Sequence, residues 1–190
     1  MKKQLMMAML PLFISCSAFA ETEPDSQVSF SGFRVGGGVI NHESDELIDD
    51  ATGFVLEAGY DFNRIVGIVG RYSDATFDND NDQNPSRLPG KVDITTWGLY
   101  SDIGYTFVGK NNFQIKPYGL IGIENINAQT DTNQGKFDEN EYALALGTGV
   151  RATFNEHFVL AAEYKFSSVD IPEYNDLDLD TVSIMVNYKF

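Results

Sequence analysis

Hydrophobic and polar residues alternate along most of this chain with a period of two. The pattern is clearest in the last eleven residues, which read DTVSIMVNYKF. Five apolar side chains share one face of this segment: Val182, Ile184, Val186, Tyr188 and Phe190. The other face carries Thr181, Ser183, Met185, Asn187 and Lys189. Such alternation is typical of a β-strand whose two faces meet different environments.

Seven further segments of this kind precede the last one, and no convincing helical period lies between them. We therefore expect eight strands, at about 28–40, 52–62, 65–73, 92–107, 113–125, 141–154, 158–167 and 180–190. The connections at 63–64, 108–112 and 155–157 are short, whereas those at 41–51, 74–91, 126–140 and 168–179 are long and polar. This asymmetry is the pattern of barrels that cross an outer membrane. The sequence predicts an all-β fold, an eight-stranded antiparallel transmembrane β-barrel with short periplasmic turns and long extracellular loops.

Charged residues within the expected strands fall on the parity opposite the apolar one. They are Arg34, Glu57, Arg71, Asp102, Lys116, Glu124, Arg151, Glu163, Lys165 and Lys189. Eleven of the 17 glycines share this parity: Gly32, Gly36, Gly38, Gly53, Gly59, Gly67, Gly98, Gly104, Gly122, Gly147 and Gly149. Glycine weakens a strand that faces water, whereas a narrow barrel needs small residues inside. We therefore expect a charge network inside the barrel, with Arg71–Glu57 and Arg34–Glu124 as candidate pairs.

The apolar parity then faces lipid, and its aromatic residues gather near the ends of the strands. Near the periplasmic ends lie Phe33, Phe62, Phe107, Phe154, Phe158 and Phe190. Near the opposite ends lie Tyr72, Trp97, Tyr142 and Phe166. Aromatic girdles of this kind mark the two membrane interfaces. A soluble secreted barrel, with its apolar face inward and its charges in water, is the alternative fold.

The inward charges allow two interpretations. They could line a narrow, gated conduit for ions or small solutes, or they could fill a packed polar interior. An unpaired buried charge is very unfavourable, so each charge must pair or keep water. Because eight strands enclose little space, the packed interior is favoured.

The first twenty residues are predicted to be a secretory signal peptide. Lys2 and Lys3 precede an apolar run at 5–14, and the small-x-small site Ala18-Phe19-Ala20 follows. A lipoprotein box ending at Cys16 is the alternative, although it begins with a phenylalanine. Cleavage after residue 20 removes the single cysteine, so we expect no disulfide.

The rest of the chain divides into a polar lead-in at 21–27 and a barrel domain at 28–190. It keeps 28 acidic residues against 11 lysines and arginines, a net charge of −17. A chain this acidic repels nucleic acid, so we expect no partner of that class. Beyond residue 20 there is no run of eighteen apolar residues, so any passage through a membrane must use a closed barrel.

Two short motifs could carry chemistry. The run at 78–82, DNDND, begins like a calcium loop, but Gln83 and Pro89 stand where an EF-hand needs Gly and Glu. The acidic loops could still attract divalent cations loosely. His42-Glu43-Ser44 is the only candidate for an activated nucleophile. It opens the first loop, whereas the His-x-Ser pair of small lipid A deacylases lies near a later strand's outer end. We expect no cofactor, no metal site and no enzyme.

The C-terminal segment resembles the assembly signal of bacterial outer-membrane β-barrels, with Ile184, Val186, Tyr188 and Phe190 carrying the likeness. The run 116–122, KPYGLIG, resembles a fifth-strand pattern of the same group. Together with the strands and loops, these features make 28–190 similar to the small OmpA-like and OmpX/Ail-type outer-membrane barrels of the porin family. The chain stops after its last strand, so the peptidoglycan-binding domain of full-length OmpA-like proteins is not expected.

This resemblance implies a monomeric protein of a Gram-negative-type cell envelope, located in the outer membrane after export through the inner membrane. Its implied partners are outer-membrane lipid and lipopolysaccharide, the barrel-assembly machinery, and host surface or serum molecules. Three functions remain open: a structural or adhesive barrel, a narrow conduit, and a lipid A-modifying enzyme. The loops are more acidic than those of adhesins that bind heparin-like polymers, so that ligand is not expected.

Overall fold

A computed structural model describes residues 29–43, 51–78, 91–132, 135–169 and 177–190 of the chain. The predicted signal peptide and lead-in lie outside the described residues. So do Ser44 of the possible nucleophile motif and positions 79–82 of the calcium-loop-like run.

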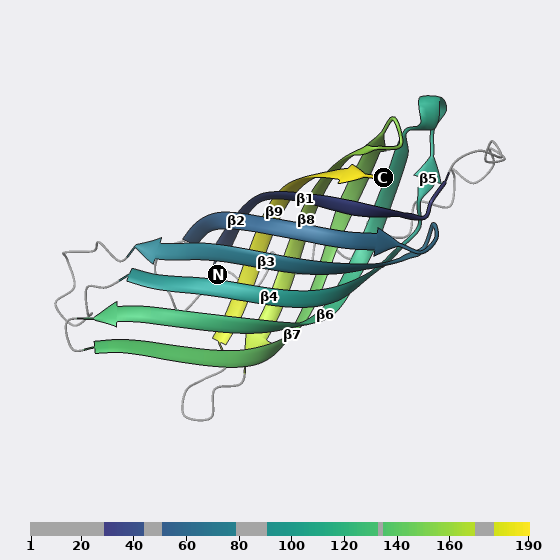
Figure 1. The fold of residues 1–190 in the computed structure, drawn as a ribbon. Helices are drawn as coiled ribbons and strands as arrows, with labels where there is room; N and C mark the ends of the chain where they lie inside the picture. Colours follow the sequence, from purple (N-terminus) through teal and green to yellow (C-terminus); the bar gives the residue numbers. More distant parts are fainter. Residues whose placement is uncertain (1–28, 44–50, 79–90, 133–134, 170–176) are drawn as a thin grey trace, which may run out of the picture.

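The described chain forms a closed antiparallel barrel. Its strands are β1 (Gly32–Glu43), β2 (Ala51–Asp61), β3 (Val66–Asp78), β4 (Lys91–Gly104), β5 (Phe107–Val108), β6 (Gln114–Thr132), β7 (Gly135–Phe154), β8 (Phe158–Val169) and β9 (Leu177–Lys189). The short β5 follows β4 after a two-residue break, and both pair with β6. β4 and β5 therefore count as one interrupted strand, and the barrel has eight strands. Pairing of β1 with β9 completes the ring. Figure 1 shows β1–β4 curving across the front, with β8 and β9 crossing behind them. The predicted eight-stranded antiparallel barrel is confirmed.

The turns at one end of the barrel are short and rely on asparagine. In the turn between β2 and β3, the Asn63 side-chain oxygen accepts hydrogen bonds from the amides of Ile65 and Val66, at 2.8 and 3.0 Å. In the turn between β7 and β8, Asn155 has a positive φ of 50°. Asparagine tolerates this left-handed conformation better than most residues. Local sequence chemistry therefore fixes these turns.

Several predicted strand boundaries were wrong, mostly at the loop end. The first strand begins at Gly32 rather than 28, and the fourth is interrupted after Gly104. The predicted loop at 126–140 is largely strand, since β6 continues to Thr132 and β7 begins at Gly135. The β3–β4 hairpin is also longer than expected, and polar side chains pair across it. Thr76 donates to Asp93 at 2.8 Å, and Thr95 donates to Asp74 at 3.0 Å. The outward residues are polar here and the inward residues Ala75 and Ile94 are apolar and buried, so the parity is reversed while the backbone pairing continues.

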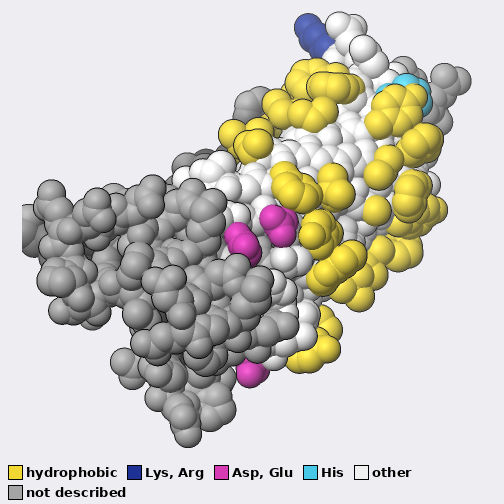
Figure 2. Space-filling view, turned by 60° about the vertical axis from the view of Figure 1, so that its left-hand side comes forward, with side chains coloured by type: hydrophobic (Ala, Val, Ile, Leu, Met, Phe, Trp, Pro, Cys, Tyr) yellow, Lys and Arg dark blue, Asp and Glu magenta, His cyan; other side chains and the backbone are white. Residues whose placement is uncertain are grey.

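The outer wall of the barrel is apolar. Trp97, Ile123 and Tyr142 expose 61, 60 and 79% of their surfaces. Figure 2 shows hydrophobic side chains spread over the wall, with acidic residues only toward one end of it. Such an extended exposed apolar surface marks contact with a membrane. No helix among the described residues is long and apolar enough to span a membrane.

Candidate functional site

The charged side chains of the strands lie inside the barrel. Nine of them expose 8% or less of their side chains: Arg34, Glu57, Arg71, Asp102, Lys116, Glu124, Arg151, Glu163 and Lys165. Alternation along each strand places them there, because every second residue of a barrel strand points inward. Lys189 is buried as well.

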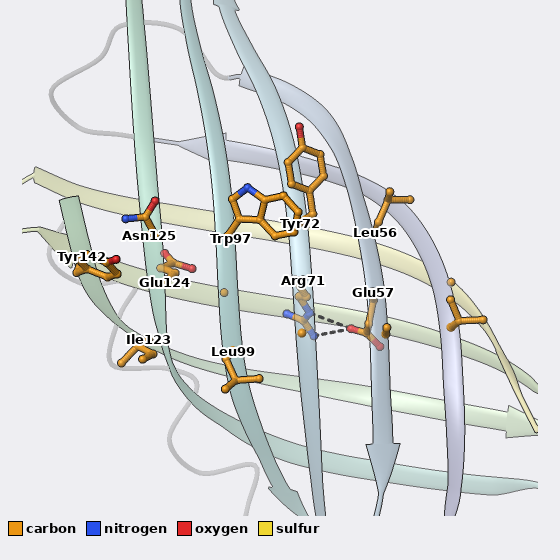
Figure 3. Close-up of a pocket in the computed structure, with 15 residues that line it drawn as sticks. Leu56, Glu57, Arg71, Tyr72, Trp97, Leu99, Ile123, Glu124, Asn125 and Tyr142 are labelled. Atoms are coloured by element: carbon orange, nitrogen blue, oxygen red, sulfur yellow. Dashed lines mark hydrogen bonds and ion pairs between the residues drawn. The ribbon is translucent and has the colours of Figure 1, made fainter. Parts of the chain in front are cut away.

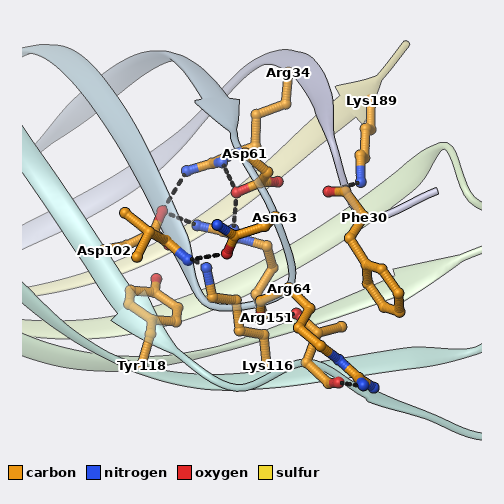
Figure 4. Close-up of polar contacts among 12 residues, drawn as sticks. Phe30, Arg34, Asp61, Asn63, Arg64, Asp102, Lys116, Tyr118, Arg151 and Lys189 are labelled. Carbon is orange, nitrogen blue, oxygen red and sulfur yellow. Dashed lines mark hydrogen bonds and ion pairs between the residues drawn. The ribbon is translucent and has the colours of Figure 1, made fainter.

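Arg34 and Arg151 share two carboxylates near the short turns (Figure 4). Arg34 donates to Asp61 at 2.7 Å and to Asp102 at 3.0 Å. Arg151 donates to the same two side chains, at 3.1 and 3.0 Å. Lys116 is a third donor to Asp102. Each carboxylate therefore bridges at least two cations, which compensates for removing all of them from water.

A second group of ion pairs lies nearer the middle of the barrel. Arg71 contacts Glu57 at 2.8 Å and also pairs with Glu163, which accepts a 2.9 Å hydrogen bond from the Tyr118 hydroxyl. Glu57 also accepts from Arg34 at 3.1 Å. Glu57 therefore joins the two groups into one network that crosses the barrel.

The structure contains one of the two candidate pairs and contradicts the other. Arg71 pairs with Glu57, but Arg34 does not pair with Glu124. Glu124 instead binds Lys165 and accepts a 2.6 Å hydrogen bond from Tyr100. The register explains this. Arg34 reaches Asp102, whereas Glu124 lies opposite Gly98, which comes four residues before Asp102 in β4.

Three inward residues of the network were missed from the sequence: Asp61, Tyr100 and Tyr118. Asp61 shares the parity of Glu57, four residues earlier, and that spacing could have identified it. The two tyrosines occupy space that inward glycines leave free. A Cβ on Gly149 would lie 2.8 Å from the Tyr118 hydroxyl, and one on Gly98 or Gly122 would collide with the ring of Tyr100. Inward glycine beside inward tyrosine is therefore a sequence signal of this packing.

The segment before β1 lies at the periplasmic mouth of the barrel. The Lys189 ammonium group donates to the Phe30 carbonyl at 2.9 Å, and the Arg64 guanidinium lies 4.8 Å from the centre of the Phe30 ring. Figure 4 shows Phe30 between these two side chains. The backbone and the ring of Phe30 thus both fix this segment at the end of the barrel.

The interior also contains an apolar cluster toward the loops. Six of its buried side chains are Ile40, Val55, Ile94, Ile126, Leu179 and Met185. They lie on the inward parity, where charges and glycines were expected, and an apolar cluster on that face was not predicted. Two cavities among the inward residues have volumes of about 20 Å³ each. A space of that size holds roughly one water molecule.

His42 of β1 lies two residues beyond Ile40 on the same inward parity and is almost fully buried. Its Nδ1 lies 2.9 Å from the Thr181 hydroxyl, which is its cross-strand neighbour on β9. The imidazole is therefore part of the packed interior. Within the described part of the chain, no group of three or more His, Cys, Asp and Glu side chains could hold a metal ion.

The residues proposed as an assembly signal lie at the seam that closes the barrel. Ile184, Val186, Tyr188 and Phe190 expose between 44 and 67% of their surfaces on the outer wall. The Tyr188 and Phe190 rings meet edge to face at 5.0 Å. The Phe190 amide donates to the Phe33 carbonyl of β1 at 2.9 Å. Recognition of this segment during assembly stays a prediction.

Comparisons with known proteins agree with this architecture. A family model described as outer membrane protein beta-barrel domain matches residues 7–190. The attachment invasion locus protein of Yersinia pseudotuberculosis serotype I (strain IP32953) is 23% identical over 177 residues, which cover 93% of this chain and 89% of that protein.

Two solved structures share the fold. The crystal structure of Ail, the attachment invasion locus protein of Yersinia pestis, in complex with the heparin analogue sucrose octasulfate, gives a TM-score of 0.55 at 20% identity, covering 84% of this chain and 97% of that one. Neisserial surface protein A gives a TM-score of 0.57 at 18% identity, covering 85% of this chain and 98% of that one.

Proposed function

The chain belongs to the outer membrane protein beta-barrel domain family, and we propose that it is a sealed barrel that presents acidic extracellular loops for attachment to other surfaces. The observation that carries this proposal is the filled interior. A cross-linked charge network and a buried apolar cluster fill it, and little room is left for a solute. In this proposal the exposed surface of the loops carries the function.

The filled interior argues against the conduit. Arg71 is held between two glutamates and Asp102 among three cations, so opening a passage would leave several buried charges unpaired. Breaking such pairs is strongly unfavourable. We expect the refolded protein to give no steady conductance in planar lipid bilayers. Reproducible single-channel steps that disappear on boiling the sample would overturn the sealed-barrel proposal.

Loop charge suggests the chemistry of the attachment partner. The connections at 41–51 and 168–179 carry five and four acidic residues and no lysine or arginine. The relative from Yersinia pestis was crystallised with a sulfated heparin analogue, and loops this acidic would repel a polyanion. We infer a partner with a cationic surface, such as a basic host protein.

Binding to charged coatings tests the partner class. Vesicles that carry the refolded protein should bind immobilised polylysine and not immobilised heparin. Neutralising Glu43, Asp45, Glu46, Asp49 and Asp50 to their amides should weaken this binding, and raising the salt concentration should have a similar effect. The matched variant replaces Asp170, Glu173, Asp176 and Asp178 and shows which loop dominates. A variant that combines both sets of substitutions should bind polylysine least. If it binds as well as the wild type, or if the wild type binds heparin, this partner class is excluded.

The structure offers little support for a lipid A-modifying enzyme. His42, the candidate base, points into the packed interior and is bound to Thr181. Expression of the protein is therefore expected to leave the mass of lipid A unchanged. A mass shift that is lost in the Ser44→Ala variant would identify the enzyme instead.

A further inference from the structure

The lipid-facing wall contains a hollow of about 840 Å³. Its floor is made by Ala58 of β2 and Gly70 of β3, which are direct cross-strand neighbours. Large apolar side chains surround this floor, among them Leu56, Leu99 and Trp97. Two adjacent small residues among large ones thus leave a depression in the apolar outer wall.

One rim of the hollow is aromatic and lies toward the loops. Tyr72 and Trp97 are cross-strand neighbours with ring centroids 4.6 Å apart. Figure 3 shows them side by side, with Leu99 below Trp97 and Leu56 to the right of Tyr72. The next outward residues beyond this rim, Asp74 and Thr95, are polar and hydrogen-bonded to each other. Tyrosine and tryptophan mark the membrane interface. The hollow therefore lies directly below the outer interface, at the depth of the outer leaflet.

What fills this hollow in a membrane must be apolar and must come from the outer leaflet. The volume falls within the roughly 300–1,000 Å³ typical of small-ligand sites. It is open to the side, and its walls continue into the lipid-facing surface. We propose that the hollow is a binding site for one acyl chain of an outer-leaflet glycolipid. This inference does not depend on the proposed attachment function.

Gly70 offers a way to fill the hollow without disturbing the barrel. A Cβ built on Gly70 would meet only the Ala58 carbonyl oxygen, at 3.8 Å, so a larger side chain would project into the empty space. Gly119 is a matched control because it also faces outward and a Cβ there would meet nothing closer than 3.9 Å. Gly119 does not line the hollow. Gly70→Leu should therefore block the site, and Gly119→Leu should not.

Trp97 provides a built-in reporter, since it is the only tryptophan of the chain and lines the hollow. The full-length mature protein would be refolded into vesicles of phosphatidylcholine with brominated acyl chains, which quench tryptophan on contact. Unlabelled lipid A would then be added in the presence of Mg²⁺. If one of its chains occupies the hollow, Trp97 fluorescence should recover at about one tenth of the lipid A fraction that random mixing requires, a tenfold preference.

The variants and a second lipid decide the outcome. In Gly70→Leu, Trp97 fluorescence should recover only as random mixing predicts. In Gly119→Leu, it should recover as in the wild type. Gly70→Ala, a milder change, should show an intermediate preference. Only preparations whose unboiled band migrates as the folded form are compared. The proposal would be overturned if the wild type behaved as random mixing predicts, or if Gly70→Leu kept the preference for lipid A. Equal recovery of fluorescence with unlabelled phosphatidylethanolamine would also overturn it.

Discussion

Asp61 is the residue on which the periplasmic half of the charge network depends. Its Oδ1 accepts from Arg34 at 2.7 Å and from Arg151 at 3.1 Å. Both arginines also reach Asp102, so the four side chains form a closed ring of ion pairs. With Asp61 included, the described interior holds five acidic residues against six basic ones, and the sixth, Lys189, donates to a backbone carbonyl.

Replacing Asp61 should therefore be costly. Asp61→Asn leaves buried Arg34 with two of its three carboxylate partners and buried Arg151 with one of its two. We expect a loss of about 3–5 kcal/mol in the free energy of unfolding. Urea titration of the protein in lipid vesicles would measure it. The control is Asp93→Asn, an exposed partner of Thr76, which should stay within about 0.5 kcal/mol of the wild type. An equally small effect for Asp61→Asn would show that the interior pairs contribute little.

Leu146 tests the orientation of the outer wall. Its side chain is 48% exposed in β7, where it lies beside Ile121 and Phe166 on the apolar face. An arginine at this depth in the membrane should destabilise the barrel by about 2–4 kcal/mol. Leu146→Phe should be nearly neutral, because lipid accommodates the larger ring. Refolding into vesicles compares the two, and tolerance of Arg with disruption by Phe would place this face inward.

At the scale of strands, period-two alternation predicted which elements exist and which face each side chain takes. It worked for strands that separate lipid from a polar interior, such as β9. It failed where the hairpins of β3–β4 and β6–β7 rise past the aromatic rim, because water lies outside the barrel there. Ion-pair partners such as those of Arg34 could not be predicted either. They depend on the stagger between strands, which sets the levels of Asp102 and Glu124, and a single sequence carries no such information.

The last strand also permits a matched test of its proposed role in assembly. Changing Tyr188 and Phe190 to serine removes both aromatics of the C-terminal segment, and we expect lower levels in the outer membrane with accumulation or degradation in the periplasm. Tyr105 and Phe107 form a similar edge-to-face pair at 5.0 Å at the same end of the barrel, on a different part of its wall. Their double serine variant loses the same interfacial contacts without touching the C-terminus. Equal membrane levels of the two variants, measured by fractionation, would show that Tyr188 and Phe190 act only as girdle residues.

At the scale of the whole molecule, closure of the ring gives the barrel its stability. Every strand except the two-residue β5 pairs with a neighbour on both sides, so the closed ring leaves little backbone edge to meet lipid or detergent. The β1–β9 seam is very close at Gly38. A Cβ there would collide with the Ile184 carbonyl oxygen and would lie 2.7 Å from the Met185 Cα. Glycine at this position therefore permits the last pairing that the fold requires.

Closure can be observed on a gel, because a closed barrel keeps its compact form in detergent until it is boiled. We expect the wild type to migrate differently before and after boiling. Gly38→Val should abolish or greatly reduce the compact band, since the added side chain has nowhere to go between β1 and β9. Gly119→Val should retain that band, because its side chain would extend into lipid. If Gly38→Val keeps a full compact band that resists detergent as well as the wild type does, the seam must tolerate a wider spacing than the structure has. The stability of the barrel would then depend less on pairing at this point than on its interior network.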